Sequence, residues 1–301
     1  MPSDASPAAR RRWLPMLLLA LVIGVGLPYG CSKLAQKERE LLFNIEPGTA
    51  SWFSGLPNGV EELNIPLSKA LSADQYLHAW WWPAEQAGAP TVLYLHGTRW
   101  NLTAQVRRIS ELRSMGFAVL AIDYRGFGKS PGDLPSERSV YEDADAAWQR
   151  LVQWQPDASK RYIYGHSLGG AIAVDLARRL AKDDDAPKAA GLIIESTFTD
   201  LGDAAAAAAN TSLPIRWIMS EKFDSIDKIA DVQVPLLIVH GLDDRYVPSV
   251  FSQRLYDAAA APKRLLLVPG GTHNNSMTVG NREYVKALRE TFGLPATLSR
   301  R

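Results

Sequence analysis

Residues 161–170 read Arg-Tyr-Ile-Tyr-Gly-His-Ser-Leu-Gly-Gly, an apolar run that ends in a serine flanked by glycines. Gly-x-Ser-x-Gly is the pattern of a nucleophile elbow, in which a strand turns sharply into a helix with the serine at its apex. Gly165 and Gly169 let the strand and the helix pass closely, and the helix N-terminus favours negative charge that develops beside Ser167. A glycine-rich connection without catalysis gives the same short pattern, so the rest of the sequence has to decide.

The segments around this elbow alternate between short apolar runs and helix-period stretches. The apolar runs span 91–95, 117–122, 161–164, 191–194, 235–239 and 264–268, and the helix-period stretches span 101–114, 140–153, 167–181, 250–259 and 282–291. Nearly continuous apolar runs are typical of parallel strands that are buried on both faces, whereas 60–65 and 75–82 alternate as antiparallel strands do. The sequence therefore predicts an α/β fold, with a mostly parallel twisted sheet of about eight strands covered by helices on both faces.

A carboxylate and a histidine follow two later strands of this predicted sheet. Asp243 and Asp244 come after the run 235–239, and His273 comes after the run 264–268. Reactive groups of such sheets collect at the carboxyl ends of the strands, and a serine needs a base that a carboxylate orients. The order serine, aspartate, histidine is that of a catalytic triad on this kind of fold. The residues alone leave the choice between the two aspartates open.

The other histidines have different expected roles. His273 is the one of five histidines that lies on a loop downstream of the acid. His96 and His166 are predicted to be packing or supporting residues, and His240, at a strand terminus, is predicted to be structural.

Six collinear motifs over roughly residues 40–295 resemble the α/β-hydrolase-domain serine hydrolases. The motifs are His96-Gly97, Asp123-Tyr-Arg-Gly-Phe-Gly-x-Ser130, Gly165-His-Ser-Leu-Gly-Gly170, Glu195-Ser-Thr-Phe198, Val239-His-Gly-Leu-Asp-Asp-Arg-Tyr-Val-Pro248 and His273-Asn-Asn275. The branch they most resemble is the membrane-anchored group that includes depalmitoylases, lysophospholipid lipases and serine-aminopeptidase-like enzymes. The resemblance implies an α/β-hydrolase fold, a Ser167–Asp244–His273 triad and no cofactor or metal.

The same resemblance assigns the oxyanion hole and a cap. Its donors map to the backbone N–H groups of Thr98 and Leu168, although many members have asparagine where this chain has Thr98. Arg99, Trp100 and Trp217 are candidates for lining the substrate pocket. A short helical cap is expected at about 197–232, between the sixth strand and the acid strand.

These observations predict a serine esterase, thioesterase or lipase-type enzyme that acts on a small or lipid-like acyl substrate through an acyl-enzyme. A serine-aminopeptidase-like peptidase or amidase is the alternative. A non-catalytic binding module on the same fold is a further alternative. It predicts the loss of a triad residue or of an elbow glycine, and none is missing.

The composition excludes several other classes. The chain has 301 residues and 47% hydrophobic residues, which fits one large domain, or two small ones, with a substantial core. Its net charge is +1, so nucleic acid is not an expected partner. Cys31 is the single cysteine, which rules out an intramolecular disulfide. No histidine and cysteine cluster has metal-ligand spacing, so no metal site is predicted.

The N-terminus predicts attachment to a membrane. Arg10-Arg-Arg12 precedes an uncharged stretch from Trp13 to Ser32, and the apolar positions 14–30 are at the short end of a membrane-spanning helix. We predict a signal anchor in the bacterial inner membrane with the catalytic domain in the periplasm; a lipoprotein signal ending at Cys31 and a cleaved secretory signal are the alternatives. The predicted organisation is a basic tail (1–12), a transmembrane anchor (13–31), a linker (32–49) and a hydrolase domain (50–295).

Overall fold

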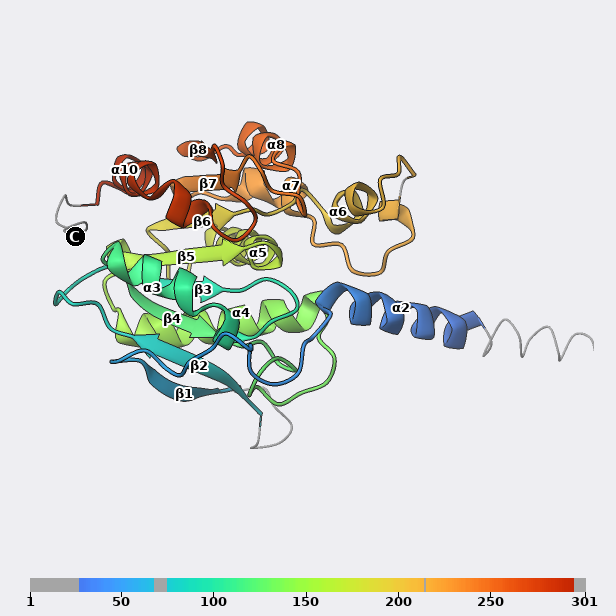
Figure 1. Cartoon of the computed structure of the whole chain (residues 1–301), viewed down its shortest axis with the longest axis horizontal. Helices are drawn as coiled ribbons and strands as arrows, with labels where there is room; N and C mark the ends of the chain where they lie inside the picture. Colours follow the sequence, from blue (N-terminus) through green and yellow to red (C-terminus); the bar gives the residue numbers. More distant parts are fainter. Residues whose placement is uncertain (1–26, 68–74, 214, 295–301) are drawn as a thin grey trace, which may run out of the picture.

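An eight-stranded sheet forms the centre of the molecule in a computed structural model, which describes residues 27–67, 75–213 and 215–294 (Figure 1). The strands are β1 (Glu61–Pro66), β2 (Tyr76–Trp82), β3 (Thr91–Leu95), β4 (Ala118–Ile122), β5 (Arg161–His166), β6 (Gly191–Glu195), β7 (Leu236–Gly241) and β8 (Lys263–Val268). Their order is β1-β2-β4-β3-β5-β6-β7-β8, and only the pairs β1–β2 and β2–β4 are antiparallel. The predicted α/β fold with a mostly parallel sheet is confirmed.

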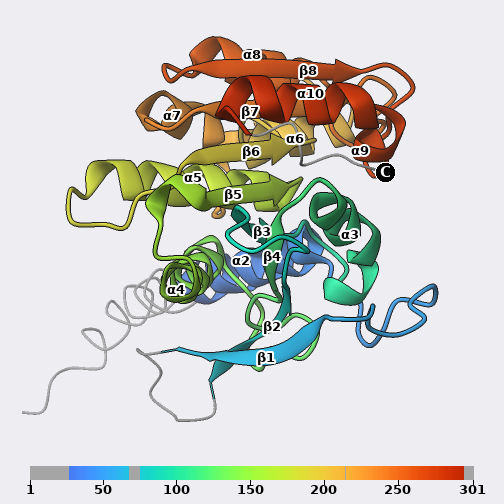
Figure 2. The ribbon, with the colours of Figure 1, turned by 90° about the vertical axis from the view of Figure 1, so that its left-hand side faces the viewer.

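Helices cover both faces of this sheet (Figure 2). On one face lie α4 (Glu137–Trp154), α5 (Leu168–Lys182) and α8 (Val250–Ala258), and on the other lie α3 (Val106–Ser114), α9 (Ser276–Val279) and α10 (Asn281–Phe292). Every residue of the central strands β3 to β7 is buried, which explains why these segments are apolar on both faces. Because β3, β5, β6, β7 and β8 are parallel, the loops that follow them meet at one edge of the sheet.

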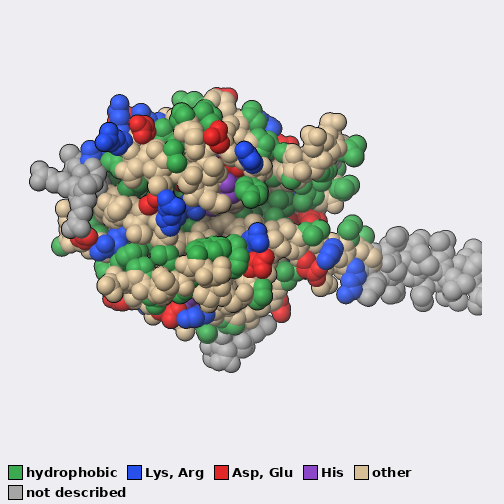
Figure 3. All heavy atoms as spheres, in the orientation of Figure 1, with side chains coloured by type: hydrophobic (Ala, Val, Ile, Leu, Met, Phe, Trp, Pro, Cys, Tyr) green, Lys and Arg blue, Asp and Glu red, His purple; other side chains and the backbone are tan. Residues whose placement is uncertain are grey.

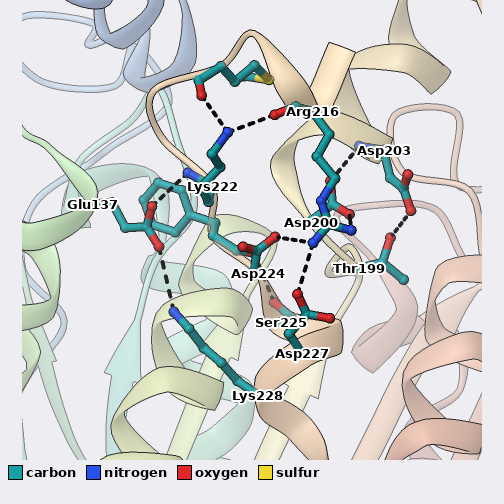
Figure 4. Close-up of polar contacts among 12 residues, drawn as sticks. Glu137, Thr199, Asp200, Asp203, Arg216, Lys222, Asp224, Ser225, Asp227 and Lys228 are labelled. Carbon is teal, nitrogen blue, oxygen red and sulfur yellow. Dashed lines mark hydrogen bonds and ion pairs between the residues drawn. The ribbon is translucent and has the colours of Figure 1, made fainter. Parts of the chain in front are cut away.

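The segment between β6 and β7 carries four short helices where the sequence predicts a cap. They are α6 (Leu201–Ala208), η4 (Ile215–Trp217), α7 (Ser225–Lys228) and η5 (Ile229–Asp231). Arg216 on η4 joins α6 and α7, since its guanidinium lies 3.7 Å from Asp200, 3.5 Å from Asp224 and 2.9 Å from Asp227 (Figure 4). A Cβ atom at Gly202 would lie 2.5 Å from Cα of Arg216, so a glycine is needed for this close contact. We call residues 197–232 the β6–β7 segment.

The N-terminal part of the described chain is a helix that leaves the body of the molecule, α2 (Leu27–Phe43) (Figure 1). It occupies much of the stretch that the sequence assigns to a linker. Residues 32–43 contain mostly leucine, lysine, glutamate, glutamine, arginine and alanine, which are good helix formers. The helix ends at Phe43, whose side chain is fully buried.

The prediction of a transmembrane signal anchor at residues 13–31 is wrong for the part of the chain that the structure describes. Across the three described ranges, no helix combines the length and the apolar character needed to cross a bilayer. The helix that enters the predicted anchor, α2, has 17 residues and includes Lys33, Lys37, Glu38, Arg39 and Glu40. Residues 13–26 lie outside the described residues. Membrane attachment through an N-terminal helix is therefore not supported.

Candidate active site

Ser167 lies at the apex of a sharp turn between β5 and α5. Its φ of 55° and ψ of −122° are unfavourable for a residue with a side chain, so the surrounding structure has to hold this conformation. A Cβ atom at Gly165 would collide with the carbonyl oxygen of Gly169, and one at Gly169 would collide with that of Leu95. The Ser167 N–H donates to the carbonyl oxygen of Glu195 at 2.9 Å. Together these contacts fix the backbone of the serine.

The loop after β3 passes directly over Ser167. A Cβ atom built on Gly97 would lie 3.0 Å from Ser167 Cβ and 3.5 Å from its Oγ, so this loop approaches the serine more closely than a larger residue allows. Thr98 follows Gly97, and Leu168 follows Ser167. Within the described ranges, neither the Thr98 N–H nor the Leu168 N–H donates a backbone hydrogen bond. An oxyanion hole requires N–H groups that are free of such bonds, and a donor role for Thr98 and Leu168 stays a prediction.

Asp244 and His273 come from two different loops and form a hydrogen bond. The Nδ1–H of His273 donates to Oδ2 of Asp244 at 2.7 Å. The other oxygen, Oδ1, accepts the N–H groups of Tyr246 and Val247, both at 2.9 Å. His240 Nε2 lies 3.2 Å from Oδ2. This arrangement fixes the direction of the carboxylate and holds the His273 ring in the tautomer that leaves Nε2 free to accept a proton.

The surroundings of Asp244 keep its carboxylate ionised. Burial of the side chain acts to raise its pKa, but the hydrogen bonds from His240 and His273, together with the N–H of Val247, outweigh burial and hold the pKa well below its usual range. Asp243, the alternative acid, is exposed, and its backbone N–H donates to the Gly271 carbonyl oxygen at 2.8 Å. The structure therefore brings Asp244 into contact with His273.

A hollow on one face of the molecule exposes histidine surface between the upper and lower parts of the body (Figure 3). Of the five histidines, His78, His96, His166 and His240 are buried, whereas His273 is partly exposed. Tyr246 lies next to it, with ring centroids 5.5 Å apart, and 73% of Tyr246 is exposed. Tyr246 is therefore a candidate substrate contact that our sequence analysis missed, although it lies in the same motif as Asp244.

The predicted pocket-lining residues lie in two places. Arg99 directs its Nε toward Oε1 of Glu46, at 3.2 Å, and its guanidinium lies 5.7 Å from the Trp100 ring. Trp100 also contacts Trp52, with ring centroids 5.2 Å apart. Trp217 is on η4 in the β6–β7 segment and is 81% exposed. A role in substrate binding stays a prediction for all three candidates.

A buried polar network contacts the main chain of the His273 loop. The carboxylate of Glu195 is fully buried at the end of β6 and accepts the hydroxyl groups of Tyr164, at 2.7 Å, and Tyr284, at 3.1 Å. Its other oxygen, Oε1, has no hydrogen-bond partner among the described residues but lies 3.7 Å from Nη2 of Arg108. The same Nη2 donates to the main-chain carbonyl of His273 at 3.4 Å.

His166 contacts the same carbonyl oxygen. Its Nε2–H donates to the His273 carbonyl at 2.8 Å. Burial lowers the pKa of His166 well below its usual value, and the nearby cation of Arg108 lowers it further, so the ring is neutral. Our sequence analysis placed His166 among the supporting residues but did not identify Arg108, because nothing local to its helix marks a contact with a residue 165 positions away.

Removing the charge of Glu195 is expected to destabilise the protein. The variant Glu195→Gln leaves the buried guanidinium of Arg108 without a counter-charge, and breaking a buried ion pair in this way costs about 3–5 kcal/mol of unfolding free energy. Urea denaturation monitored by tryptophan fluorescence measures this loss. The matched control is the double variant Arg108→Met/Glu195→Gln, which removes both charges and should recover part of the stability. A single variant as stable as wild type would contradict this expectation.

The geometry defines a class of protein. A mostly parallel sheet with a serine elbow after β5, and with an aspartate–histidine pair on the loops after β7 and β8, is the architecture of an α/β hydrolase. Among the residues that the structure describes, no group of histidine, cysteine, aspartate and glutamate side chains is arranged to hold a metal ion.

Comparisons with known proteins agree with this class. A family model described as serine aminopeptidase, S33, matches residues 87–228. An uncharacterized protein of Mycobacterium tuberculosis, MT2364, is 35% identical over 96% of this chain and 98% of its own length. The chain belongs to the serine hydrolase group of the α/β-hydrolase superfamily, and it is an enzyme of the hydrolase class.

Two further similarities concern proteins with described activities. The lysophosphatidylserine lipase ABHD12 of Danio rerio is 34% identical over 68% of this chain and 58% of its own length. The Pyrococcus furiosus esterase Pf2001 has a similar structure, with a TM-score of 0.64 and 19% sequence identity, over 83% of this chain and 98% of the esterase. At that identity, the second similarity concerns the fold.

Proposed function

We propose that this protein is a serine hydrolase that cleaves an ester or thioester of a lipid-like or other acyl substrate through an acyl-enzyme. The observation that carries the proposal is the 2.7 Å hydrogen bond between His273 Nδ1 and Asp244 at the sheet edge where Ser167 occupies a strained elbow. Strained backbone of this kind collects at functional sites. The strain supports a role for the Ser167 hydroxyl beyond packing.

The chemistry follows from the roles of the three side chains. The Ser167 Oγ attacks the carbonyl carbon while His273 Nε2 accepts its proton. The carbonyl electrons move to the oxygen, and this oxyanion accepts hydrogen bonds from the N–H groups of Thr98 and Leu168. Collapse of the intermediate expels the alcohol or thiol, which takes the proton from His273. Water then gives a proton to His273 and attacks the acyl-enzyme carbonyl. Collapse of this second intermediate breaks the bond to Ser167, returns the proton to its Oγ and releases the acid.

Asp244 acts by stabilising the charged form of His273 during both steps. Its carboxylate stays ionised at any working pH because its pKa is held well below the usual range. The N–H groups of Tyr246 and Val247 and the rings of His240 and His273 surround this carboxylate. It therefore does not need to move as His273 gains and loses a proton. No cofactor takes part in the proposed reaction.

The preference for an ester or thioester rests on two observations. One relative with a described activity is a lysophosphatidylserine lipase, and lipids of that kind carry an acyl ester. In addition, Trp217, Ile218 and Tyr246 are 81%, 79% and 73% exposed on the β6–β7 segment and the acid loop. Exposed apolar side chains of this size suit an acyl chain. A peptidase is the second candidate, because the matching family model is described as serine aminopeptidase, S33.

A substrate panel separates the two candidates. We expect the full chain to hydrolyse p-nitrophenyl esters of fatty acids of graded length with a kcat/KM at least about tenfold above that for aminoacyl p-nitrophenyl esters, which carry the same leaving group, a barrier difference of about 1.4 kcal/mol or more. Initial rates at 405 nm measure both. Faster release from the aminoacyl esters than from the fatty-acyl esters would overturn the choice of an acyl substrate and favour the peptidase.

A further inference from the structure

The oxyanion loop contains a strained turn directly after Thr98. The N–H of Trp100 donates to the carbonyl oxygen of Thr98 at 3.0 Å, which closes a three-residue γ-turn around Arg99. Arg99 has a φ of 76°, and γ-turns with a positive φ at the central residue are rare and strained. Arginine has no special tolerance for this region, so other contacts must hold the turn.

Those contacts come from the end of helix α2 and the residues after it. The Arg99 N–H donates to the carbonyl oxygen of Phe43 at 2.9 Å, and the Arg99 carbonyl accepts the N–H of Glu46 at 2.8 Å. Both peptide groups that flank the strained residue are therefore tied to the same short segment. We call residues 43–46 the strap.

The strap is itself anchored in the body of the molecule. The Phe43 ring is fully buried, and it packs edge-on against Phe127, with ring centroids 6.2 Å apart, and against Phe223, at 6.4 Å. Earlier on α2, the Glu38 carboxylate accepts the N–H groups of Ser220, at 2.9 Å, and Glu221, at 2.8 Å. The helix thus joins the oxyanion loop to the β6–β7 segment, since Phe223 also belongs to that segment.

We propose that the strap is a positioning element of the catalytic site, and that its two backbone hydrogen bonds to Arg99 set the direction of the Thr98 N–H. This inference rests on the proposed function, in which Thr98 is an oxyanion donor. The peptide bearing the Thr98 N–H is one step along the chain from the tied residue. A release of Arg99 to negative φ would rotate the neighbouring peptides and turn the donor away from the oxygen.

The strap lies outside residues 87–228, which the family model matches. The N-terminal segment of this chain therefore contributes to catalysis rather than only leading into the hydrolase domain. Helix α2 also holds the β6–β7 segment through Glu38. The position of α2 therefore affects both this segment, whose exposed apolar side chains suit an acyl chain, and the loop that carries Thr98.

One pair of variants of the full chain isolates the backbone hydrogen bond. Glu46→Pro removes the N–H that holds the Arg99 carbonyl, and Glu46→Ala keeps this N–H while removing the side chain that pairs with Arg99. Pro47 already disfavours the helical region for residue 46, and a proline at position 46 shares this preference for extended backbone. For Glu46→Pro we expect kcat on a p-nitrophenyl ester to fall by about 10- to 100-fold. The KM should change by less than about threefold, because an oxyanion donor acts mainly in the transition state.

The control Glu46→Ala keeps the backbone N–H and removes only an exposed ion pair, so we expect it to lose much less kcat than Glu46→Pro. Equal losses in both variants would overturn the proposal, because the side chain would then be responsible, and so would an unchanged kcat in Glu46→Pro. Phe43→Ala is the second variant. It removes the ring that seats the strap, and we expect a lower kcat at unchanged KM that Phe43→Leu largely restores.

Two failures can be told apart. An active Ser167→Ala variant would overturn the proposed function itself. Activity that depends on Ser167 but is the same in wild type, Glu46→Pro and Phe43→Ala would overturn only the role of the strap. Thermal unfolding of each variant shows whether a loss of kcat accompanies a loss of fold.

Discussion

Ser167→Ala is expected to lower ester hydrolysis on the order of 10⁶-fold and to abolish labelling by a fluorophosphonate probe. Removing a serine nucleophile leaves only the catalysis that the oxyanion hole and substrate binding provide. Alanine keeps the Cβ atom and hence the same backbone strain at φ 55°, so the fold should be retained. The measurements are initial rates on the best p-nitrophenyl ester and in-gel fluorescence of the labelled protein.

Ser249→Ala is the matched control for this prediction. Ser249 precedes helix α8, and its side chain makes no capping hydrogen bond. We expect wild-type rates and full labelling for this variant. Labelling of wild type and Ser167→Ala to the same extent would show that the probe reacts elsewhere and would contradict the proposed mechanism.

Asp244→Asn is expected to lower kcat by about 10⁴-fold. Oδ2 accepts from His273 Nδ1 and lies 3.2 Å from His240 Nε2, which also donates to the Val247 carbonyl oxygen. An amide that keeps its oxygen toward the N–H groups of Tyr246 and Val247 presents an NH₂ group to two ring N–H donors. His273 then turns or changes tautomer, and Nε2 no longer accepts the serine proton.

Asp243→Asn provides the matched control, because the two residues are adjacent and only Asp243 is exposed. Its kcat should stay within about threefold of wild type. Steady-state kinetics at several pH values measure both variants. The reverse pattern, a large loss for Asp243→Asn and none for Asp244→Asn, would show that the acid is misassigned.

The same carboxylate also links stability to pH. Its pKa is lowered in the folded state, so its ionisation contributes stability that is present above the unfolded value of about 3.9 and is lost as the pH falls toward the folded pKa. Asp244→Asn can therefore lose stability as well as activity. Thermal unfolding of this variant at neutral pH, measured together with its kinetics, separates loss of fold from loss of catalysis.

The fold could be predicted because its signals are local. The runs at 91–95 and 191–194 coincide with β3 and, to within one residue, with β6, and both strands are buried along their whole length. Burial on both faces favours an apolar residue at every position, and this preference is visible in the sequence as a continuous apolar run. Residues 32–49 carried no such signal, because a solvated helix and a polar linker share the same composition.

The site residues were identified for a related reason. A serine between Gly165 and Gly169 is marked by a steric requirement, and Asp244 and His273 each follow a buried strand. Their catalytic roles stay predictions until the variants above are measured. For the described residues the transmembrane assignment is wrong, because α2 begins at Leu27 and continues past residue 31 with five charged side chains, and no helix of the described ranges is long and apolar enough to cross a bilayer.

The sequence by itself determined the succession of strands and helices along the chain, the serine elbow and the set of residues from which an acid and a base could come. Each of these depends on the period of apolar residues or on a glycine at a fixed spacing, and both are properties of a few adjacent positions. The tertiary structure decided that Asp244 rather than Asp243 contacts His273, and that Phe43 and Glu46 hold Arg99. It also decided that Arg108 and Glu195 lie beneath the His273 loop. Those contacts join residues far apart in the chain through single hydrogen bonds or charges, and no local pattern requires them.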